Sequence, residues 1–346
     1  MRSVMDKRNI YGMTPDALRE YFRSRGENPA KADIVFDGIY RRALPINALG
    51  LSERVTKMLA ADFCEELPRT AERCESENAA KLLLDLGGDY VETVLMRQRF
   101  GAFVCVSTQV GCSMGCAFCR SGMLKKQRSL TSAEMTGQVL ALSHELGVKI
   151  NGVSVMGIGE PFDNFDAVRE FCEIITAGKG LGLGERHITV STCGIVPKIY
   201  EYADLAHPCN LAISLHAPTD ELRSSLMPIN RAYPLSQLIP AAEYYTKKTN
   251  RRAALEYVML NGVNDSVDDA RRLAQLIGAR RFYVNIIPYN ATDSGFSPSP
   301  RERIMAFYDV LKKHGVSVTM RREFGSGLNA ACGQLSAEHS DGGALF

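Results

Sequence analysis

The segment Gly111-Cys112-Ser113-Met114-Gly115-Cys116-Ala117-Phe118-Cys119 decides how the rest of the chain is interpreted. It places three cysteines in a C-x3-C-x2-C pattern, shortly after a β-branched run that predicts a strand. The glycines at 111 and 115 have no Cβ, so they let the backbone wrap closely around a bulky object. We therefore expect the three thiols to converge in one loop at the end of a strand.

A loop of this kind suits a soft metal site. Thiolates bind iron–sulfur clusters, zinc or copper, but structural zinc sites usually take four ligands in two spaced pairs. Three cysteines leave one iron of a 4Fe–4S cluster without a protein ligand. S-adenosylmethionine (SAM) needs that position to chelate the iron before it is cleaved reductively to a radical. Two other interpretations stay open: three small buried cysteines, or a zinc knuckle completed by a remote ligand.

The composition is that of an ordinary folded protein. The 346 residues are 45% hydrophobic and 23% charged, and the ten cysteines are too sparse for a disulfide scaffold. The first residues lack an apolar signal core, and no run approaches the roughly 18 uncharged apolar residues of a spanning helix. We expect a cytoplasmic monomer without a membrane segment. With a net charge of only +2, any RNA contact must use local basic patches.

From about residue 91 the sequence alternates between strand-like and helix-like segments, which predicts a parallel sheet. About six such units are too few for a closed eight-stranded barrel, so we expect an α/β fold with a partial (β/α)6 barrel. Several of the strands end in polar or glycine-rich sequence, where parallel α/β folds hold their active sites. The predicted strands are 103–107, 152–156, 187–190, 211–214, 254–258, 283–287 and 316–320.

The chain is expected to contain a small helical domain before this sheet. Residues 1–90 are predicted to be helical, and the first helix should begin at the cap Thr14 with Pro15 in its first turn. Residues 91–336 then form the α/β core, and 337–346 form a flexible tail.

The cysteine loop and its flanks resemble the RlmN/Cfr family of radical SAM enzymes, which methylate adenine in RNA. The resemblance covers about 91–336, whereas the helical N-terminus resembles the family's RNA-binding accessory domain only in length and texture. It implies a radical SAM barrel that holds a 4Fe–4S cluster and uses two SAM molecules per turnover. The matching segments are Val91–Val94, Cys105–Cys112, Gly157–Pro161, Ser191–Gly194, Ser214–Pro218, Glu256–Leu260, Gly262–Asp265, Asn285–Asn290 and Ala330–Leu335.

The resemblance assigns Cys112, Cys116 and Cys119 as the cluster ligands. It also places SAM contacts at the carboxyl ends of the predicted strands. There a glycine permits close backbone approach and a carboxylate can accept from the cofactor's ammonium group. The residues that match these contacts are Gly159, Glu160, Ser191, Ser214, Leu215, His216 and Asn290. The histidine among them is not expected to act as a base, because a lone histidine is more often a satisfied buried side chain.

By the same resemblance, Cys332 carries a methyl group that one SAM molecule delivers. A radical from a second SAM molecule then abstracts hydrogen from that methyl, and the resulting carbon radical adds to the adenine ring. Cys105 releases the product by attacking the sulfur of the adduct, which leaves a transient Cys105–Cys332 disulfide. Glu92 stands where the family has the base that removes the ring proton. Without the resemblance, both cysteines are predicted to be buried small residues and Glu92 an exposed strand-edge carboxylate.

The remaining cysteines and the basic clusters have simpler interpretations. Cys64, Cys74, Cys172, Cys193 and Cys209 show no ligand spacing and are predicted to be packing residues, although Cys193 stands where the family usually has a small polar residue. Basic clusters in 120–128, 247–252 and 321–322 are candidates for RNA phosphates on the active-site side, although such runs are usually solvated faces.

The resemblance implies methylation of carbon 2 of an adenine in 23S ribosomal RNA, with transfer RNA as a second candidate substrate and a cellular electron donor. The adenine must leave its stack to be modified. Gln109–Cys112 resembles the carbon-2 branch. Arg321–Gly325 is somewhat similar to the Cfr branch, which methylates carbon 8 and confers antibiotic resistance, and Phe324–Asn329 lacks an acidic stretch common in carbon-2 enzymes. The alternatives from other classes are a radical SAM activase or dehydrogenase and a zinc-stabilised RNA-binding protein.

Overall fold

A ten-stranded sheet runs through most of the computed structural model, which describes residues 7–291 and 294–321. Its strands are β3 (Arg69–Glu75), β4 (Ala79–Asp85), β5 (Tyr90–Gln98), β6 (Gly101–Cys105), β9 (Ile150–Val155), β10 (Ile188–Thr192), β11 (Asn210–Ser214), β12 (Ala253–Met259), β13 (Phe282–Pro288) and β14 (Val318–Met320). Their order is β14-β13-β12-β11-β10-β9-β6-β5-β4-β3. The strands from β6 to β14 pair in parallel, and β5, β4 and β3 extend the sheet antiparallel. The result is an open α/β barrel, as the sequence predicts.

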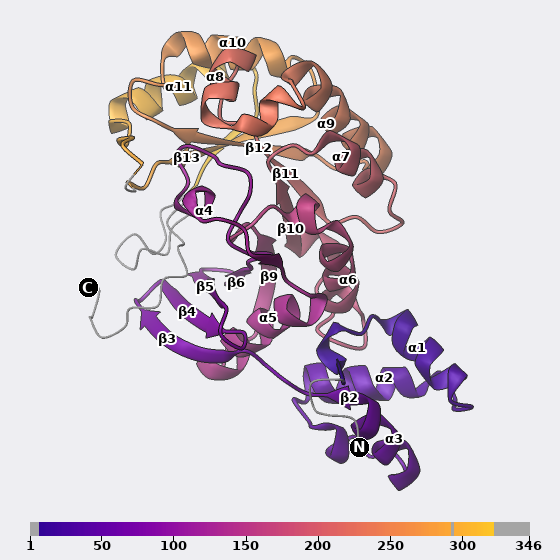
Figure 1. Ribbon diagram of the computed structural model, residues 1–346. Coiled ribbons are helices and arrows are strands. Elements are labelled where there is room, and N and C mark those ends of the chain that lie inside the picture. The colour runs from indigo at the N-terminus through magenta and orange to yellow at the C-terminus, as the bar shows by residue number, and fades with distance from the viewer. Residues whose placement is uncertain (1–6, 292–293, 322–346) are drawn as a thin grey trace.

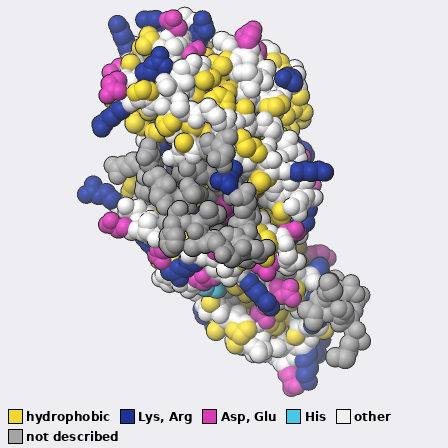
Figure 2. Space-filling model, turned by 60° about the vertical axis from the view of Figure 1, so that its left-hand side comes forward, with side chains coloured by type: hydrophobic (Ala, Val, Ile, Leu, Met, Phe, Trp, Pro, Cys, Tyr) yellow, Lys and Arg dark blue, Asp and Glu magenta, His cyan; other side chains and the backbone are white. Residues whose placement is uncertain are grey.

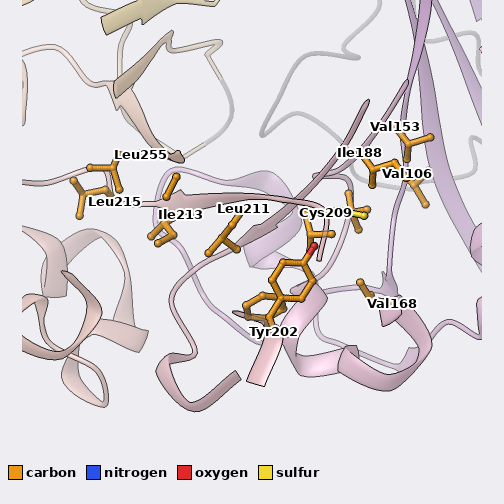
Figure 3. Packing of buried hydrophobic residues seen from close by; sticks show 14 of the residues in the cluster. Val106, Val153, Val168, Ile188, Tyr202, Cys209, Leu211, Ile213, Leu215 and Leu255 are labelled. Carbon is orange, nitrogen blue, oxygen red and sulfur yellow. The ribbon is translucent and has the colours of Figure 1, made fainter. Parts of the chain in front are cut away.

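Helices cover the convex side of this curved sheet (Figure 1). They are α5 (Ser132–Leu146), α6 (Phe165–Thr176), α7 (Val196–Ala203), α9 (Leu235–Thr249), α10 (Val267–Ile277) and α11 (Arg301–Lys313). Because successive side chains of a strand point to opposite faces, Leu211 and Ile213 of β11 pack toward Tyr202 of α7 (Figure 3). Ser214 of the same strand faces the concave side. Within the described part of the chain, no helix combines the length and apolar composition needed to cross a bilayer.

Two short strand pairs and two short helices lie outside the main sheet and its covering helices. β7 (Gln109–Val110) pairs antiparallel with β8 (Arg128–Ser129), β1 (Arg8–Asn9) pairs with β2 (Phe63–Cys64), and α4 (Arg120–Met123) and α8 (Asp220–Leu226) lie in loops after strands β7 and β11. The cysteine segment therefore lies between β7 and α4, in the connection that follows β6.

Three helices form a separate group at the N-terminus: α1 (Pro15–Ser24), α2 (Lys31–Phe36) and α3 (Glu53–Asp62). Their buried apolar side chains form their own cluster, which also touches α5 and α6 (Figure 1). The prediction of helices up to residue 90 is wrong for 69–90, because β3 and β4 belong to the main sheet. The segment Ala79–Leu84 contains good helix formers, but it is buried and pairs with strands on both sides, which overrides local propensity.

All seven predicted strands overlap strands of the sheet. The first helix also begins as predicted, with Thr14 as its cap and Pro15 at its first position. The predicted tail, 337–346, lies outside the described residues.

Thr14→Ala is expected to lower the free energy of unfolding by about 1 kcal/mol, because the Thr14 side chain accepts a hydrogen bond from the Ala17 N–H at 3.2 Å. Chemical denaturation of the two proteins measures the difference. Ser52→Ala is the matched control: Ser52 caps α3 without a side-chain hydrogen bond, so its loss should cost clearly less. Equal losses in both variants would contradict the role of the Thr14 bond.

Candidate active site and cofactor pocket

The cysteine loop is held at both ends by backbone hydrogen bonds. The Cys112 N–H donates to the Leu124 carbonyl at 3.1 Å, and the Ala117 N–H donates to the Leu226 carbonyl at 2.9 Å. Gly111 has a φ of +74°, and a Cβ there would lie 2.2 Å from the Lys125 carbonyl oxygen. Only glycine therefore lets the chain turn at this point.

All three loop cysteines line one pocket at the carboxyl ends of the parallel strands. Among the described residues, no three His, Cys, Asp or Glu side chains stand close enough together to enclose a single metal ion. Burial raises the pKa of the Cys112 thiol to about 11 and raises that of Cys116 further. Since metal ligation requires thiolates, binding of a cluster must displace these protons.

Of the predicted SAM contacts, all but one line the same pocket: Gly159, Glu160, Ser191, Ser214, His216 and Asn290. They come from the ends of β9, β10, β11 and β13, so the parallel sheet brings together residues that are far apart in sequence. The exception is Leu215. Its side chain is fully buried in the core on the opposite side of the sheet, near Leu255 (Figure 3). The predicted contact through Leu215 therefore cannot use its side chain.

The Glu160 carboxylate is fixed beside the pocket by three donors. One oxygen accepts from the Thr192 hydroxyl at 2.7 Å and the Phe162 N–H at 3.0 Å, and the other from the Cys193 N–H at 2.7 Å. Burial raises the pKa of the Glu160 carboxyl, and these hydrogen bonds oppose that rise by stabilising the charged form. Gly159 precedes it with a φ of +104°, and a Cβ there would come within 2.7 Å of the Thr108 hydroxyl.

His216 is a neutral side chain in this pocket. Its Nδ1 accepts from the Val258 N–H at 3.0 Å, so the ring proton belongs on Nε2. Burial, assisted by the nearby Arg223 charge, lowers the pKa of His216 to about 3. A group with this pKa is a poor proton acceptor near neutral pH, which agrees with the prediction that His216 is not a base.

Cys105 and Glu92 lie on one face of the sheet beside the pocket. Cys105 pairs with Val94 across β5 and β6, and Glu92 stands two residues before Val94, so their side chains share a face. Cys105 clusters with Met156, which lines the pocket. The prediction made without the resemblance, that Glu92 is exposed, is wrong: Glu92 is only 4% exposed and forms an ion pair with Lys81 at 2.6 Å. Cys332, the predicted methyl carrier, lies outside the described residues.

The sequence analysis did not assign some of the pocket residues to the SAM site. Glu256 and Arg321 line the pocket, and Glu256 accepts from the Asn285 side chain at 2.8 Å. Glu256 could have been noticed in the sequence, because it is the one charged residue in the otherwise apolar run 254–258. Cys193 also lines the pocket besides packing near the loop. Among the other cysteines, Cys172 and Cys209 are buried as predicted, whereas Cys74 is exposed on β3.

The basic clusters do not share one surface. Residues 247–252 precede β12 and therefore lie at the amino ends of the strands, opposite the pocket, so their predicted place on the active-site side is wrong. There Lys247 and Lys248 form ion pairs with Glu243 and Asp204. Lys126 and Arg128 follow the cysteine loop and are also paired with carboxylates. On the face in Figure 2, Lys and Arg side chains are interspersed with Asp and Glu.

Comparison with known proteins agrees with this site. Residues 106–274 match the Radical SAM superfamily. The chain is 43% identical to the probable dual-specificity RNA methyltransferase RlmN of Listeria welshimeri, and the match covers 96% of this chain and 95% of the relative. It is 44% identical to the protein of the same name from Streptococcus pyogenes, with 96% of each chain covered. A crystal structure of a radical SAM methyltransferase from Sphaerobacter thermophilus superposes with a TM-score of 0.89 at 38% identity, over 96% of this chain and all of that one.

The donor set of the pocket fits the cofactors of this superfamily, a 4Fe–4S cluster and SAM. Three soft thiols come from one loop, and a buried carboxylate and strand-end hydroxyls lie beside them. The loop glycines leave the backbone free to approach a bulky group closely. Pocket, sequence and structural match agree, and the chain belongs to the RlmN family of radical SAM RNA methyltransferases.

Proposed function

We propose that this protein methylates carbon 2 of an adenine in 23S ribosomal RNA, accepts transfer RNA as a second substrate, and uses Cys332 as the methyl carrier. The observation that carries the proposal is the grouping of the cysteine loop, the SAM-contact residues and the Cys105–Glu92 face around one pocket. We further expect a monomer in the cytoplasm that takes electrons from a cellular protein donor.

Cys112, Cys116 and Cys119 would hold the cluster as thiolates, and Glu160 would accept the ammonium group of SAM. When bound, the cluster supplies the electron that cleaves SAM and so provides a radical for hydrogen abstraction. The protein's own part is to bind SAM at the strand ends, to exclude water from the pocket and to hold Cys105 and Glu92 ready on the adjacent face.

Cys105 and Glu92 would act on the methylated base. Glu92 accepts the ring proton, and Lys81 holds its carboxylate in place through the 2.6 Å ion pair. As a thiolate, Cys105 attacks the Cys332 sulfur of the methylene-bridged adduct: a sulfur–sulfur bond forms and the sulfur–carbon bond breaks. The methylene carbon leaves with the electron pair of that bond and takes up a proton, which releases the methylated adenine. A protein thiol reductant must then reduce the Cys105–Cys332 disulfide before the next turnover.

Glu160→Gln is expected to weaken SAM binding to the cluster-loaded protein tenfold or more, about 1.4 kcal/mol, because a charge-assisted hydrogen bond is lost. Calorimetric titration with SAM measures the change. Glu27→Gln removes a buried carboxylate that pairs with Lys31 in the N-terminal helices, so it should leave SAM affinity unchanged. Unaltered SAM affinity in the Glu160 variant would remove this residue from the site.

Glu92→Gln is expected to slow methyl transfer to RNA about 100-fold or more, the usual contribution of a general base. Single-turnover assays with saturating SAM measure the rate. Glu75→Gln changes an ion-paired carboxylate of β3, two strands away in the sheet, and should keep the wild-type rate. A wild-type rate in the Glu92 variant would assign the proton acceptor elsewhere.

The substrate assignment is tested with purified, cluster-loaded protein, SAM labelled in its methyl group, and a chemical reductant. Separate reactions contain 23S ribosomal RNA and transfer RNA. We expect label in adenosine of both RNAs, and faster incorporation into the ribosomal RNA. Label in transfer RNA alone would overturn the ribosomal assignment, and label in neither would overturn the proposed function.

A further inference from the structure

Arg223 is a fully buried cation beside the cluster pocket. Its side chain has 0% exposure and is the largest fully buried side chain among the described residues. All four oxygens that accept from its guanidinium are uncharged: the carbonyls of Leu215 at 3.2 Å, Ser214 at 3.0 Å and Cys193 at 2.6 Å, and the Asn230 amide at 2.9 Å. In the described part of the chain, Arg223 forms no salt bridge.

A buried charge without a charged partner is costly, so such a charge normally has an anion close by. The carboxylate of Asp220 acts on Arg223 electrostatically but forms its hydrogen bonds elsewhere: its Oδ1 accepts from the Leu235 N–H at 2.8 Å and the Asn230 amide at 3.0 Å. Although burial lowers the pKa of Arg223 to about 10, the side chain remains charged at neutral pH. Its countercharge is therefore expected in the pocket.

The position of Arg223 supports this conclusion. Its carbonyl partners at 193 and 214 belong to pocket-lining residues at the ends of β10 and β11. Cys193, whose carbonyl accepts from the guanidinium at 2.6 Å, lines the pocket together with Cys116, so the charge lies beside the loop cysteines. Gly194 leaves room for it, since a Cβ there would lie 3.3 Å from Nη2 of Arg223.

We propose that Arg223 is the buried countercation of the cluster, raising the cluster's reduction potential and fixing the turn from Ser214 to His216 through its hydrogen bonds. The inference rests on the proposed cluster ligands. A 4Fe–4S cluster on three thiolates is anionic and becomes more so when it takes up one electron. A fixed positive charge therefore stabilises the reduced form more than the oxidised form. Arg223 is a positioning residue, because its guanidinium does not touch the cluster. It donates hydrogen bonds to the carbonyls of pocket residues, and its positive charge acts on the cluster electrostatically.

The test is a potentiometric titration of anaerobically reconstituted, full-length protein with dithionite as the one-electron reductant, followed by electron paramagnetic resonance. Arg223→Met removes the charge, and Arg223→Lys keeps it. In Arg223→Met, we expect the ratio of reduced to oxidised cluster at a fixed potential to fall at least tenfold, a shift of about 59 mV to lower potential. Arg223→Lys should change this ratio by less than threefold.

Asn230→Ala is the matched control, because it removes one hydrogen bond of Arg223 but leaves the charge. Its potential should stay near that of the wild type. Should Arg223→Met fail to hold a cluster, Arg223→Gln takes its place: it still donates hydrogen bonds but lacks the charge, and its potential should fall below that of Arg223→Lys.

Equal potentials in the charged and uncharged variants, or equal shifts in Arg223→Met and Asn230→Ala, would overturn the proposal. The titration needs no RNA. If the protein modified no adenine, the proposed function would be wrong, but this titration would still give a result. If the protein bound no iron, the assignment of the cluster ligands itself would be wrong.

Discussion

Cys116→Ala is expected to lose the cluster and, with it, all methylation of RNA. The Cys116 thiol lines the pocket together with the other two motif cysteines, and a cluster held by three thiolates has no replacement for a missing one. Iron content should fall from about four atoms per chain to less than one, and the brown colour should disappear. Iron and sulfide analysis after anaerobic purification measures the loss, and methylated adenosine should fall below detection.

Cys172→Ala is the control for this experiment, because Cys172 is a buried cysteine of α6 outside the pocket. It should retain both iron and activity. Wild-type iron content in the Cys116 variant would contradict the assignment of the motif. A colourless wild-type protein that contains zinc would revive the zinc site, which the sequence alone left open.

The second large effect is expected for Cys332→Ala. The variant should load iron and bind SAM like the wild type but form no methylated adenosine, because it lacks the sulfur that accepts the first methyl group. Nucleoside mass spectrometry of RNA treated with the purified variant measures this outcome. Cys74→Ala, in an exposed cysteine of β3, should keep wild-type activity.

Methylation by an iron-loaded Cys332 variant would mean that no methyl group passes through this thiol. The radical would then act directly on its substrate, as in the activase and dehydrogenase alternatives. Loss of both iron and activity would instead assign a structural role to Cys332 and would contradict its role as a carrier.

The parallel sheet could be predicted from sequence because its strands are β-branched runs separated by helical segments. The antiparallel strands β3, β4 and β5 could not be predicted in the same way. The segment Ala79–Leu84 has the composition of a helix, and its pairing with β3 on one side and β5 on the other makes it a strand. The prediction of helices up to residue 90 was wrong for 69–90 for this reason.

The pocket could be predicted in outline because carboxyl ends of parallel strands meet at one edge of the sheet. The Leu215 side chain lies outside the pocket because it follows Ser214 directly, and adjacent side chains of an extended chain point to opposite faces. Arg223 left no local signal. Its partners are backbone carbonyls at the ends of two strands, and those contacts exist only in the folded protein.

The most direct test of the central claim is nucleoside mass spectrometry of RNA from a host that lacks this methylation and expresses the protein, with 2-methyladenosine resolved from 8-methyladenosine. We expect 2-methyladenosine to appear in 23S ribosomal RNA with the wild-type protein and to be absent with Cys332→Ala. Exclusive 8-methyladenosine would place the chemistry at carbon 8. No methylated adenosine from an iron-loaded protein would contradict the proposed function.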